Sequence, residues 1–88
     1  TKAFQEDSSL VYALYNIGYI HLVQKEFKKS IEYFNKAIEI NPDFAESYYN
    51  RGLIYIYQGK TEQGREDLSK AGELGLYGAY NILRRYAK

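Results

Sequence analysis

The amino-acid sequence repeats itself at a spacing of 34 residues. Tyr15-Asn16-Ile17-Gly18 returns as Tyr49-Asn50-Arg51-Gly52, and further residues recur between segments 11–44 and 45–78. These matches exceed the roughly two identities that chance would give at ordinary composition. A period of this length is typical of supersecondary units that stack on one another. We therefore expect the function to lie on a surface formed by helices and not in a single buried active site.

Composition narrows the class of protein. The chain has 88 residues, enough for one domain at most, and 17% of them are aromatic, with eleven tyrosines. Its net charge of +1 argues against nucleic acid as a partner, because binders of this size carry a strong basic excess. The lysines and arginines cluster in two places, which we interpret as solvated faces: Lys25, Lys28 and Lys29, and Arg84, Arg85 and Lys88. No apolar run is long enough to span a membrane.

Hydrophobic periodicity predicts five helices and no strand. They are expected at about 9–24, 27–40, 44–58, 61–74 and 79–87. Asp7, Ser8 or Ser9 is expected to cap the first helix. Asn41-Pro42-Asp43 marks the strongest break, and Asp43 with Glu46 has the spacing of a capping box. Gly59 is expected to end the third helix.

The order of conserved residue types resembles the tetratricopeptide repeat (TPR). The first unit reads Leu14-x2-Ile17-Gly18-x2-His21, Ser30-x3-Phe34, Pro42, and the second reads Tyr48-x2-Arg51-Gly52-x2-Tyr55, Gly64-x3-Leu68. The resemblance implies an all-α fold, a right-handed superhelix of antiparallel helix pairs (a TPR-like alpha-alpha solenoid). Its parts are an N-terminal extension or start of the first helix (1–10), repeat 1 (11–44), repeat 2 (45–78) and a C-terminal capping helix (79–88).

Two positions depart from the TPR pattern. Gly75-Leu76 stands where the family prefers proline, and Arg51 stands where an aliphatic residue is usual. The stretch Ala71–Gly75 followed by Ala79 also resembles Sel-like repeats, so the choice between the two subfamilies stays open. Within either one, we expect the first helix to pack through three residues on Phe34 and Ala37: Leu14, Ile17 and His21. Tyr48 and Tyr55 are expected to pack on Leu68 and Ala71.

The first helix of each unit carries more apolar surface than one packing face requires. If these helices line the inside of a superhelix, as the resemblance implies, they form a groove that binds a partner peptide or protein segment. Tyrosine suits such a groove because it offers wide contact area at low entropic cost. The predicted groove residues are Tyr12, Tyr15, Asn16, Tyr19, Leu22, Tyr49, Asn50, Leu53, Ile56, Tyr80, Leu83 and Arg84.

The same residues have a structural interpretation. First helices of this family also pack on the next repeat, and Asn16 and Asn50 are common there without any ligand. The chain is then the structural or terminal part of a longer repeat protein, or it forms a homo-oligomer through its aromatic face. A clamp for acidic C-termini is excluded, because Tyr15, Tyr19 and Tyr80 occupy three of its five charge-reading positions. The chain lacks methionine altogether, so we expect a processed product or an excised piece.

No combination of residues indicates catalysis. His21 is the single histidine and lies on the predicted core face, and cysteine is absent. No carboxylate spacing matches a calcium loop, and Gly59-Lys60-Thr61 lacks the strand and glycine of a phosphate loop. We therefore predict a non-enzymatic protein-binding module with no cofactor and no metal. Its partner is another protein or peptide, and the sequence does not specify a compartment.

Overall fold

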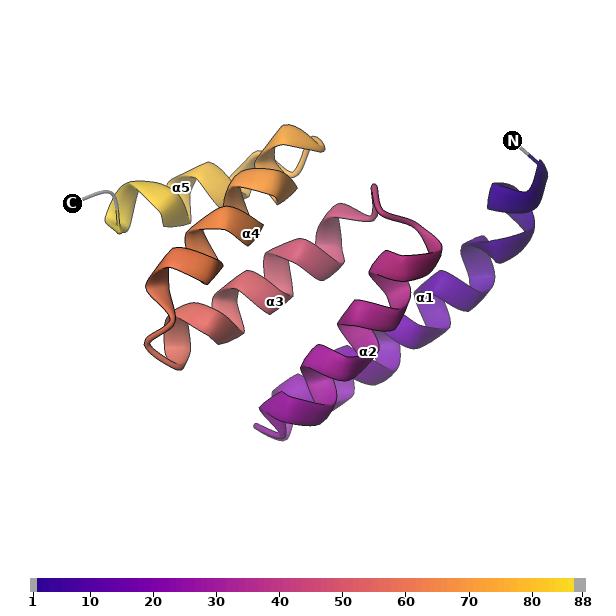
Figure 1. The fold of residues 1–88 in the computed structure, drawn as a ribbon, viewed down its shortest axis with the longest axis horizontal. Coiled ribbons are helices and arrows are strands. Elements are labelled where there is room, and N and C mark those ends of the chain that lie inside the picture. The colour runs from indigo at the N-terminus through magenta and orange to yellow at the C-terminus, as the bar shows by residue number, and fades with distance from the viewer. Residues whose placement is uncertain (1, 87–88) are drawn as a thin grey trace. The chain divides into compact units, whose positions relative to one another are not determined.

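The computed structural model describes residues 2–86, with side chains described from residue 9, and the regular structure in that range is entirely helical (Figure 1). The helices are α1 (Lys2–Val23), α2 (Phe27–Ile40), α3 (Ala45–Tyr57), α4 (Thr61–Glu73) and α5 (Gly78–Arg85). They divide into two compact units after Phe44: α1 packs on α2, and α3 and α5 each pack on α4. The all-α prediction is confirmed, whereas the stacking of the two units into one superhelix stays a prediction.

The predicted helix bounds hold within about two residues, except at the N-terminus. α1 begins at Lys2, not near residue 9, so Asp7, Ser8 and Ser9 lie inside the helix and do not cap it. The first residues include lysine, alanine, glutamine and glutamate, which are good helix formers, and the stretch has neither proline nor glycine to stop the helix. At the other end α5 stops at Arg85, and residues 87 and 88, including Lys88, lie outside the described range.

The turns inside the two helix pairs have the same geometry. The N–H of Glu26 donates to the carbonyl of His21 at 2.8 Å, and the N–H of Lys60 donates to Tyr55 at 2.8 Å. Both bonds close a helix end in the way that needs a left-handed residue just before them. Gly59 supplies that residue with φ 84° in the second unit, whereas Lys25 supplies it with φ 64° in the first. The first unit therefore accepts backbone strain that the second avoids.

The Asn41-Pro42-Asp43 junction ends α2 as predicted, but its capping is different. Asn41 is extended, as the residue before proline prefers, and its Oδ1 accepts the N–H of Asp43 at 3.0 Å. Because α3 begins at Ala45, the cap position falls on Phe44 and not on Asp43. The predicted capping box between Asp43 and Glu46 is therefore wrong; Glu46 instead places an acidic side chain in the first turn of α3.

The core of the first unit is aromatic. Val11, Ala37 and Phe44 form a buried cluster, against which Leu14, Tyr15 and Ile40 pack. Phe34 is fully buried, as predicted, and lies against Gly18: a Cβ added to that glycine would meet the Phe34 ring at 2.8 Å. Ser30 joins α2 to α1 at the same point, because its hydroxyl donates a hydrogen bond to the Gly18 carbonyl at 2.7 Å.

Two predicted core residues of the first unit lie elsewhere. Ile17 is 38% exposed, because the buried side of α1 is centred on Val11 and Gly18, with Leu14 and Tyr15 beside them and Ile17 turned away. His21 is only partly buried: its ring stacks on Tyr33 at 5.7 Å, and its Nδ1 lies 2.6 Å from Glu26 Oε1. His21 therefore lies beside the α1–α2 turn, partly exposed, and not in the core.

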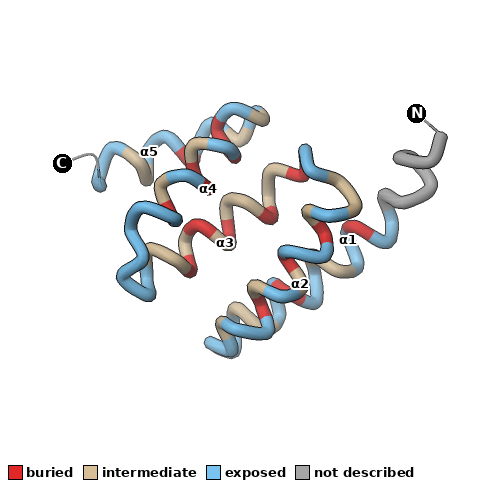
Figure 2. Tube along the Cα trace, in the orientation of Figure 1, coloured by how far each residue is buried: buried red, intermediate tan, exposed pale blue. Residues whose placement is uncertain are grey.

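The core of the second unit depends on close helix approach. Leu68, Ala71 and Ala79 are buried together, and buried positions recur along α3 and α4 (Figure 2). A Cβ on Gly64 would lie 2.8 Å from the Gly52 carbonyl oxygen, so the backbones of α3 and α4 nearly touch. Gly72 has a related role: the Tyr80 ring covers it, with Cζ 2.6 Å from where a Cβ would stand. Gly72 therefore makes room for the Tyr80 ring of α5, and α4 continues through this glycine to Glu73.

Candidate protein-binding surfaces

In the first unit, α1 exposes three of its predicted groove residues. Tyr12 is 53% exposed, Tyr19 is 47% exposed and Asn16 is exposed between them. Tyr12 meets Phe44 edge-on with ring centroids 5.0 Å apart, and Tyr19 lies 6.3 Å from Tyr15. Aromatic contacts of this kind restrict the rings while leaving part of their surface open.

Tyr15 and Leu22 are only partly exposed, and Tyr15 packs against the buried cluster of the first unit. The Tyr15 ring lies 5.6 Å from Phe34 and 5.3 Å from Phe44, so it bridges the two buried rings of the core. The surface that α1 offers to a partner is consequently narrower than the predicted set. We use the name Tyr12–Tyr19 face for its exposed members, Tyr12, Asn16 and Tyr19.

In the second unit, most predicted groove residues pack inside the unit. Four of them lie against the buried Leu68 cluster and are half-buried: Tyr49, Leu53, Ile56 and Leu83. Asn50 is buried, and its amide donates to the Glu46 carbonyl at 3.1 Å. The face that corresponds to the Tyr12–Tyr19 face is thus largely occupied by contacts with α4 and α5.

α5 keeps two of its predicted site residues accessible. Tyr80 is 39% exposed although its ring rests on Gly72, and Arg84 is exposed with its Nη2 donating to Asn81 Oδ1 at 2.8 Å. A positioned ring and a guanidinium one turn apart can contact an apolar group and a carboxylate of a partner.

Sequence analysis did not identify the ion pair between α3 and α4. Arg51 Nε lies 2.7 Å from Asp67 Oδ2, and Arg51 Nη2 lies 2.8 Å from Asp67 Oδ1. The rings of Tyr48 and Tyr55 flank the guanidinium, with centroids 5.7 and 5.8 Å away. The bidentate bond to Asp67 raises the pKa of Arg51 above its ordinary value, against the opposing effect of burial.

This pair explains the unusual Arg51. Positions 51 and 67 correspond to Ile17 and Tyr33 in the first repeat, where no charge occurs. Tyr55, expected to pack on Leu68 and Ala71, instead lies beside Arg51 and Lys60. A charged residue at an apolar repeat position, together with an acid in the facing helix, was the signal available in the sequence.

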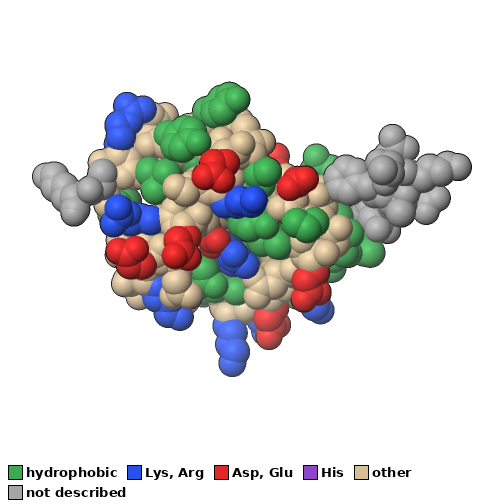
Figure 3. All heavy atoms as spheres, turned by 45° about the horizontal axis from the view of Figure 1, so that its top comes forward, with side chains coloured by type: hydrophobic (Ala, Val, Ile, Leu, Met, Phe, Trp, Pro, Cys, Tyr) green, Lys and Arg blue, Asp and Glu red, His purple; other side chains and the backbone are tan. Residues whose placement is uncertain are grey.

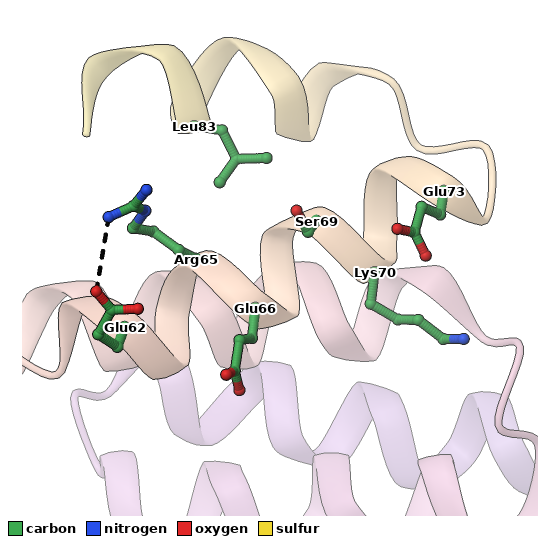
Figure 4. Close-up of a pocket in the computed structure, with 7 residues that line it drawn as sticks. All are labelled: Glu62, Arg65, Glu66, Ser69, Lys70, Glu73 and Leu83. Atoms are coloured by element: carbon green, nitrogen blue, oxygen red, sulfur yellow. Dashed lines mark ion pairs between the residues drawn. The ribbon is translucent and has the colours of Figure 1, made fainter. Parts of the chain in front are cut away.

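An open pocket is lined by residues of α4 and by Leu83 of α5 (Figure 4). Its volume is about 420 Å³, and its lining alternates in charge: Glu62, Arg65, Glu66, Ser69, Lys70, Glu73 and Leu83. Arg65 Nη1 lies 3.7 Å from Glu62 Oε2, an exposed pair that contributes little stability. Leu83 is the one predicted site residue among them. On the face shown in Figure 3, acidic and basic side chains are likewise interspersed with hydrophobic ones.

The described residues include neither a helix that could span a membrane nor a cluster of metal-binding side chains. None of their helices combines the length and apolarity that a membrane span requires. No three side chains among His, Cys, Asp and Glu lie close enough together there to hold a metal ion.

Comparison with known families agrees with this geometry. Two models described as "Tetratricopeptide repeat" match the chain, one over residues 11–44 and the other over residues 33–66. The chain belongs to the tetratricopeptide repeat family. Proteins of this family mediate protein–protein interaction, and a role in protein interaction or assembly follows for this chain.

Several relatives are longer proteins. The chain is 36% identical over 72 residues to the photosystem I assembly protein Ycf3 of Rippkaea orientalis, covering 80% of this chain and 42% of that protein. It is 32% identical over 60 residues to Ycf3 of Acaryochloris marina, covering 68% of this chain and 36% of that protein. A UDP-N-acetylglucosamine–peptide N-acetylglucosaminyltransferase of Giardia intestinalis is 40% identical over 60 residues.

The chain matches only part of each of these relatives. The chain spans less than half of each Ycf3 relative. The match covers 68% of this chain but 4% of the transferase, and only its tetratricopeptide part. Family membership and the assembly proteins together indicate a non-catalytic adaptor.

Proposed function

We propose that the chain is a protein-binding adaptor that contacts its partner through the Tyr12–Tyr19 face of α1. The observation that carries the proposal is that each of these tyrosines is about half exposed, Tyr12 at 53% and Tyr19 at 47%, over a packed aromatic support. Rings held in this way bury large area on binding at little cost in side-chain entropy. Asn16 lies between them and offers both a donor and an acceptor to a peptide backbone.

The chemistry of this face favours an uncharged or aromatic segment as the partner. Residues 9–24 contain no Asp, Glu, Lys or Arg, so nothing on α1 in that range attracts a strongly charged peptide. Tyr80 and Arg84 on α5 supply a second contact area, where the guanidinium can meet a carboxylate. The proposal names a class of partner, an extended or helical protein segment with apolar anchors.

A structural role is the second candidate, and one observation favours it. Tyr49, Leu53 and Ile56 occupy the positions of Tyr15, Tyr19 and Leu22, one repeat later, and they pack within their own unit. By that precedent the α1 residues also serve to pack against further repeats. The two candidates differ in whether a partner peptide contacts Tyr12 and Asn16. One repeat later Glu46 stands in place of Tyr12, and Asn50, in place of Asn16, is buried.

Selection from a random peptide library displayed on phage, with the 88-residue chain as bait, tests the binding role. Selected peptides are measured by fluorescence anisotropy against the wild type, Tyr12→Ala/Tyr19→Ala and Tyr77→Ala. We expect the double variant to lose affinity at least about tenfold, since exposed aromatic anchors dominate binding energy. Tyr77, 73% exposed on the second unit, is the matched control and should change little.

Two results would count against the proposal. One is a library that yields no enriched peptide; the other is equal affinity in the double variant and the wild type. Thermal unfolding of each variant separates lost binding from lost structure. A large fall in the melting temperature of the double variant, with no binding peptide, would favour the structural role.

A further inference from the structure

α1 has a second exposed side that the Tyr12–Tyr19 face does not include. Leu10 is 50% exposed, Ile17 is 38% exposed, Ile20 is 55% exposed, and Ala13 is exposed among them. At about 100° per residue these four side chains fall within a wedge of about 80°, on the side of α1 away from the buried Gly18. We call them the α1 stripe.

The α1 stripe differs from the other exposed helix faces of the chain. Exposed positions of α2 and α4 are mostly charged, for example Lys28, Glu32, Glu66 and Lys70. The stripe lies in the segment 9–24, which contains no Asp, Glu, Lys or Arg. Single exposed apolar residues are ordinary, but a contiguous uncharged row of them marks an interaction surface.

The spacing of the α1 stripe fits a helix as its occupant. Residues 10, 13, 17 and 20, continued by Gln24, follow the alternating 3-and-4 spacing of the a and d positions in a two-helix contact. Ala13 permits close approach of a second helix at one point of this row. A helix that covers the row must itself present uncharged apolar side chains, because a buried unpaired charge would oppose the contact.

We propose that the α1 stripe is a dimerisation surface, on which α1 of a second copy of the chain packs. Within the described residues α1 is the helix that provides an uncharged row of this length, so each copy brings the surface that the other requires. The pairing brings no like charges together, and its two-fold symmetry makes it self-complementary. Ile17 is the middle of the five positions, so it meets its own copy whether the two helices run parallel or antiparallel.

The size of the surface sets the expected strength. Stable protein interfaces bury about 800 Å² on each partner, more than four partly buried side chains supply. We therefore expect a weak dimer with a dissociation constant in the micromolar range. At dilutions below that constant the chain is monomeric.

Sedimentation equilibrium over roughly 5–500 μM protein tests the proposal in that range. We expect reversible dimerisation of the wild type, weakened at least about tenfold in Ile17→Glu and in Ile20→Glu. Tyr77→Glu adds the same charge at a 73% exposed site of the second unit and should leave the dimer unchanged. An equimolar mixture of Ile17→Glu and Ile17→Lys should dimerise again, since opposite charges then face each other.

The absence of cysteine from the chain allows a second test that does not depend on charge. Ile17→Cys should form an intermolecular disulfide on mild oxidation faster than the control Tyr77→Cys at equal concentration. A chain that stays monomeric at the highest concentration, or equal cross-linking rates for the two cysteine variants, overturns the proposal. So does a wild-type-like dimer in both folded glutamate variants, because the dimer would then use another surface.

Discussion

The Arg51–Asp67 pair offers the sharpest test of how the second unit is stabilised. Replacing Arg51 with Met keeps an unbranched side chain between Tyr48 and Tyr55 but leaves the Asp67 carboxylate without its guanidinium. The Asp67 side chain is 9% exposed, so water can solvate the orphaned charge only partly. Removing one partner of a fully buried pair costs about 3–5 kcal/mol. Because the Arg51 side chain is 20% exposed, we expect a smaller loss of about 2–4 kcal/mol.

A double-mutant cycle separates the ion pair from ordinary packing. Asp67→Leu alone leaves the Arg51 charge unpaired and should cost about 1–3 kcal/mol, less than the Arg51 change because the guanidinium retains more contact with water. The variant Arg51→Met/Asp67→Leu removes both charges, and its free energy of unfolding should lie within about 1 kcal/mol of the wild type. The coupling energy is then roughly 2 kcal/mol or more.

Urea unfolding followed by far-UV circular dichroism provides these free energies. Single-variant losses that simply add in the double variant would refute the reasoning, because the two charges would then not depend on each other. A loss below about 0.5 kcal/mol in Arg51→Met would refute it as well, since the pair would behave like an exposed one.

The effect of Arg51 should not depend on pH over the range in which the protein is usually studied. The pKa of Arg51 is raised in the folded state above its ordinary value, chiefly by the hydrogen bonds to Asp67. A raised pKa stabilises the fold fully below the unfolded value, and this stabilisation is lost only as pH rises through the folded value. Both values lie far above that range, so the loss caused by Arg51→Met should be equal at about pH 6 and pH 9.

Three further predictions concern packing and backbone strain, and urea unfolding checks each. Phe34→Ala should cost about 3–5 kcal/mol, because the ring is fully buried against Gly18; a loss under about 1 kcal/mol would contradict its place in the core. Gly64→Ala should cost about 1–3 kcal/mol, since its Cβ would face a backbone oxygen at 2.8 Å, whereas the control Gly78→Ala has open space and should not destabilise. Lys25→Gly should stabilise by about 0.5–1 kcal/mol, because φ is 64° there; no gain would mean that the turn tolerates lysine without strain.

The helices and turns could be predicted because local signals determine them. Pro42 and Gly59 mark breaks that any packing must respect, and the bounds of α2 to α4 follow from periodicity between such breaks. Gly18 and Gly52 were also predictable as points of close approach, since a glycine that recurs inside a helix has few other uses.

The buried side of α1 was predicted less well. Its segment 9–24 is apolar nearly all round, so periodicity alone cannot tell Tyr15, which packs, from Ile17, which is exposed. The Arg51–Asp67 pair and the contact of the Tyr80 ring with Gly72 depend on the register between neighbouring helices, that is, on which of their residues face each other. The close approach at Gly52 and Gly64 and the turn at Gly75 set this register. It cannot be predicted from any one segment of the sequence alone. The partner-binding role of the candidate residues stays a prediction.

The near-contact between the backbones at Gly52 and Gly64 has a consequence for local opening of the second unit. Amide protons next to this crossing can reach solvent only if α3 and α4 separate, because backbone lies directly against backbone there. They should therefore take up deuterium last among the amides of this unit. In the first unit a Cβ on Gly18 would lie 3.2 Å from the Ser30 carbonyl oxygen, a wider approach of the two backbones, and exchange there should be faster.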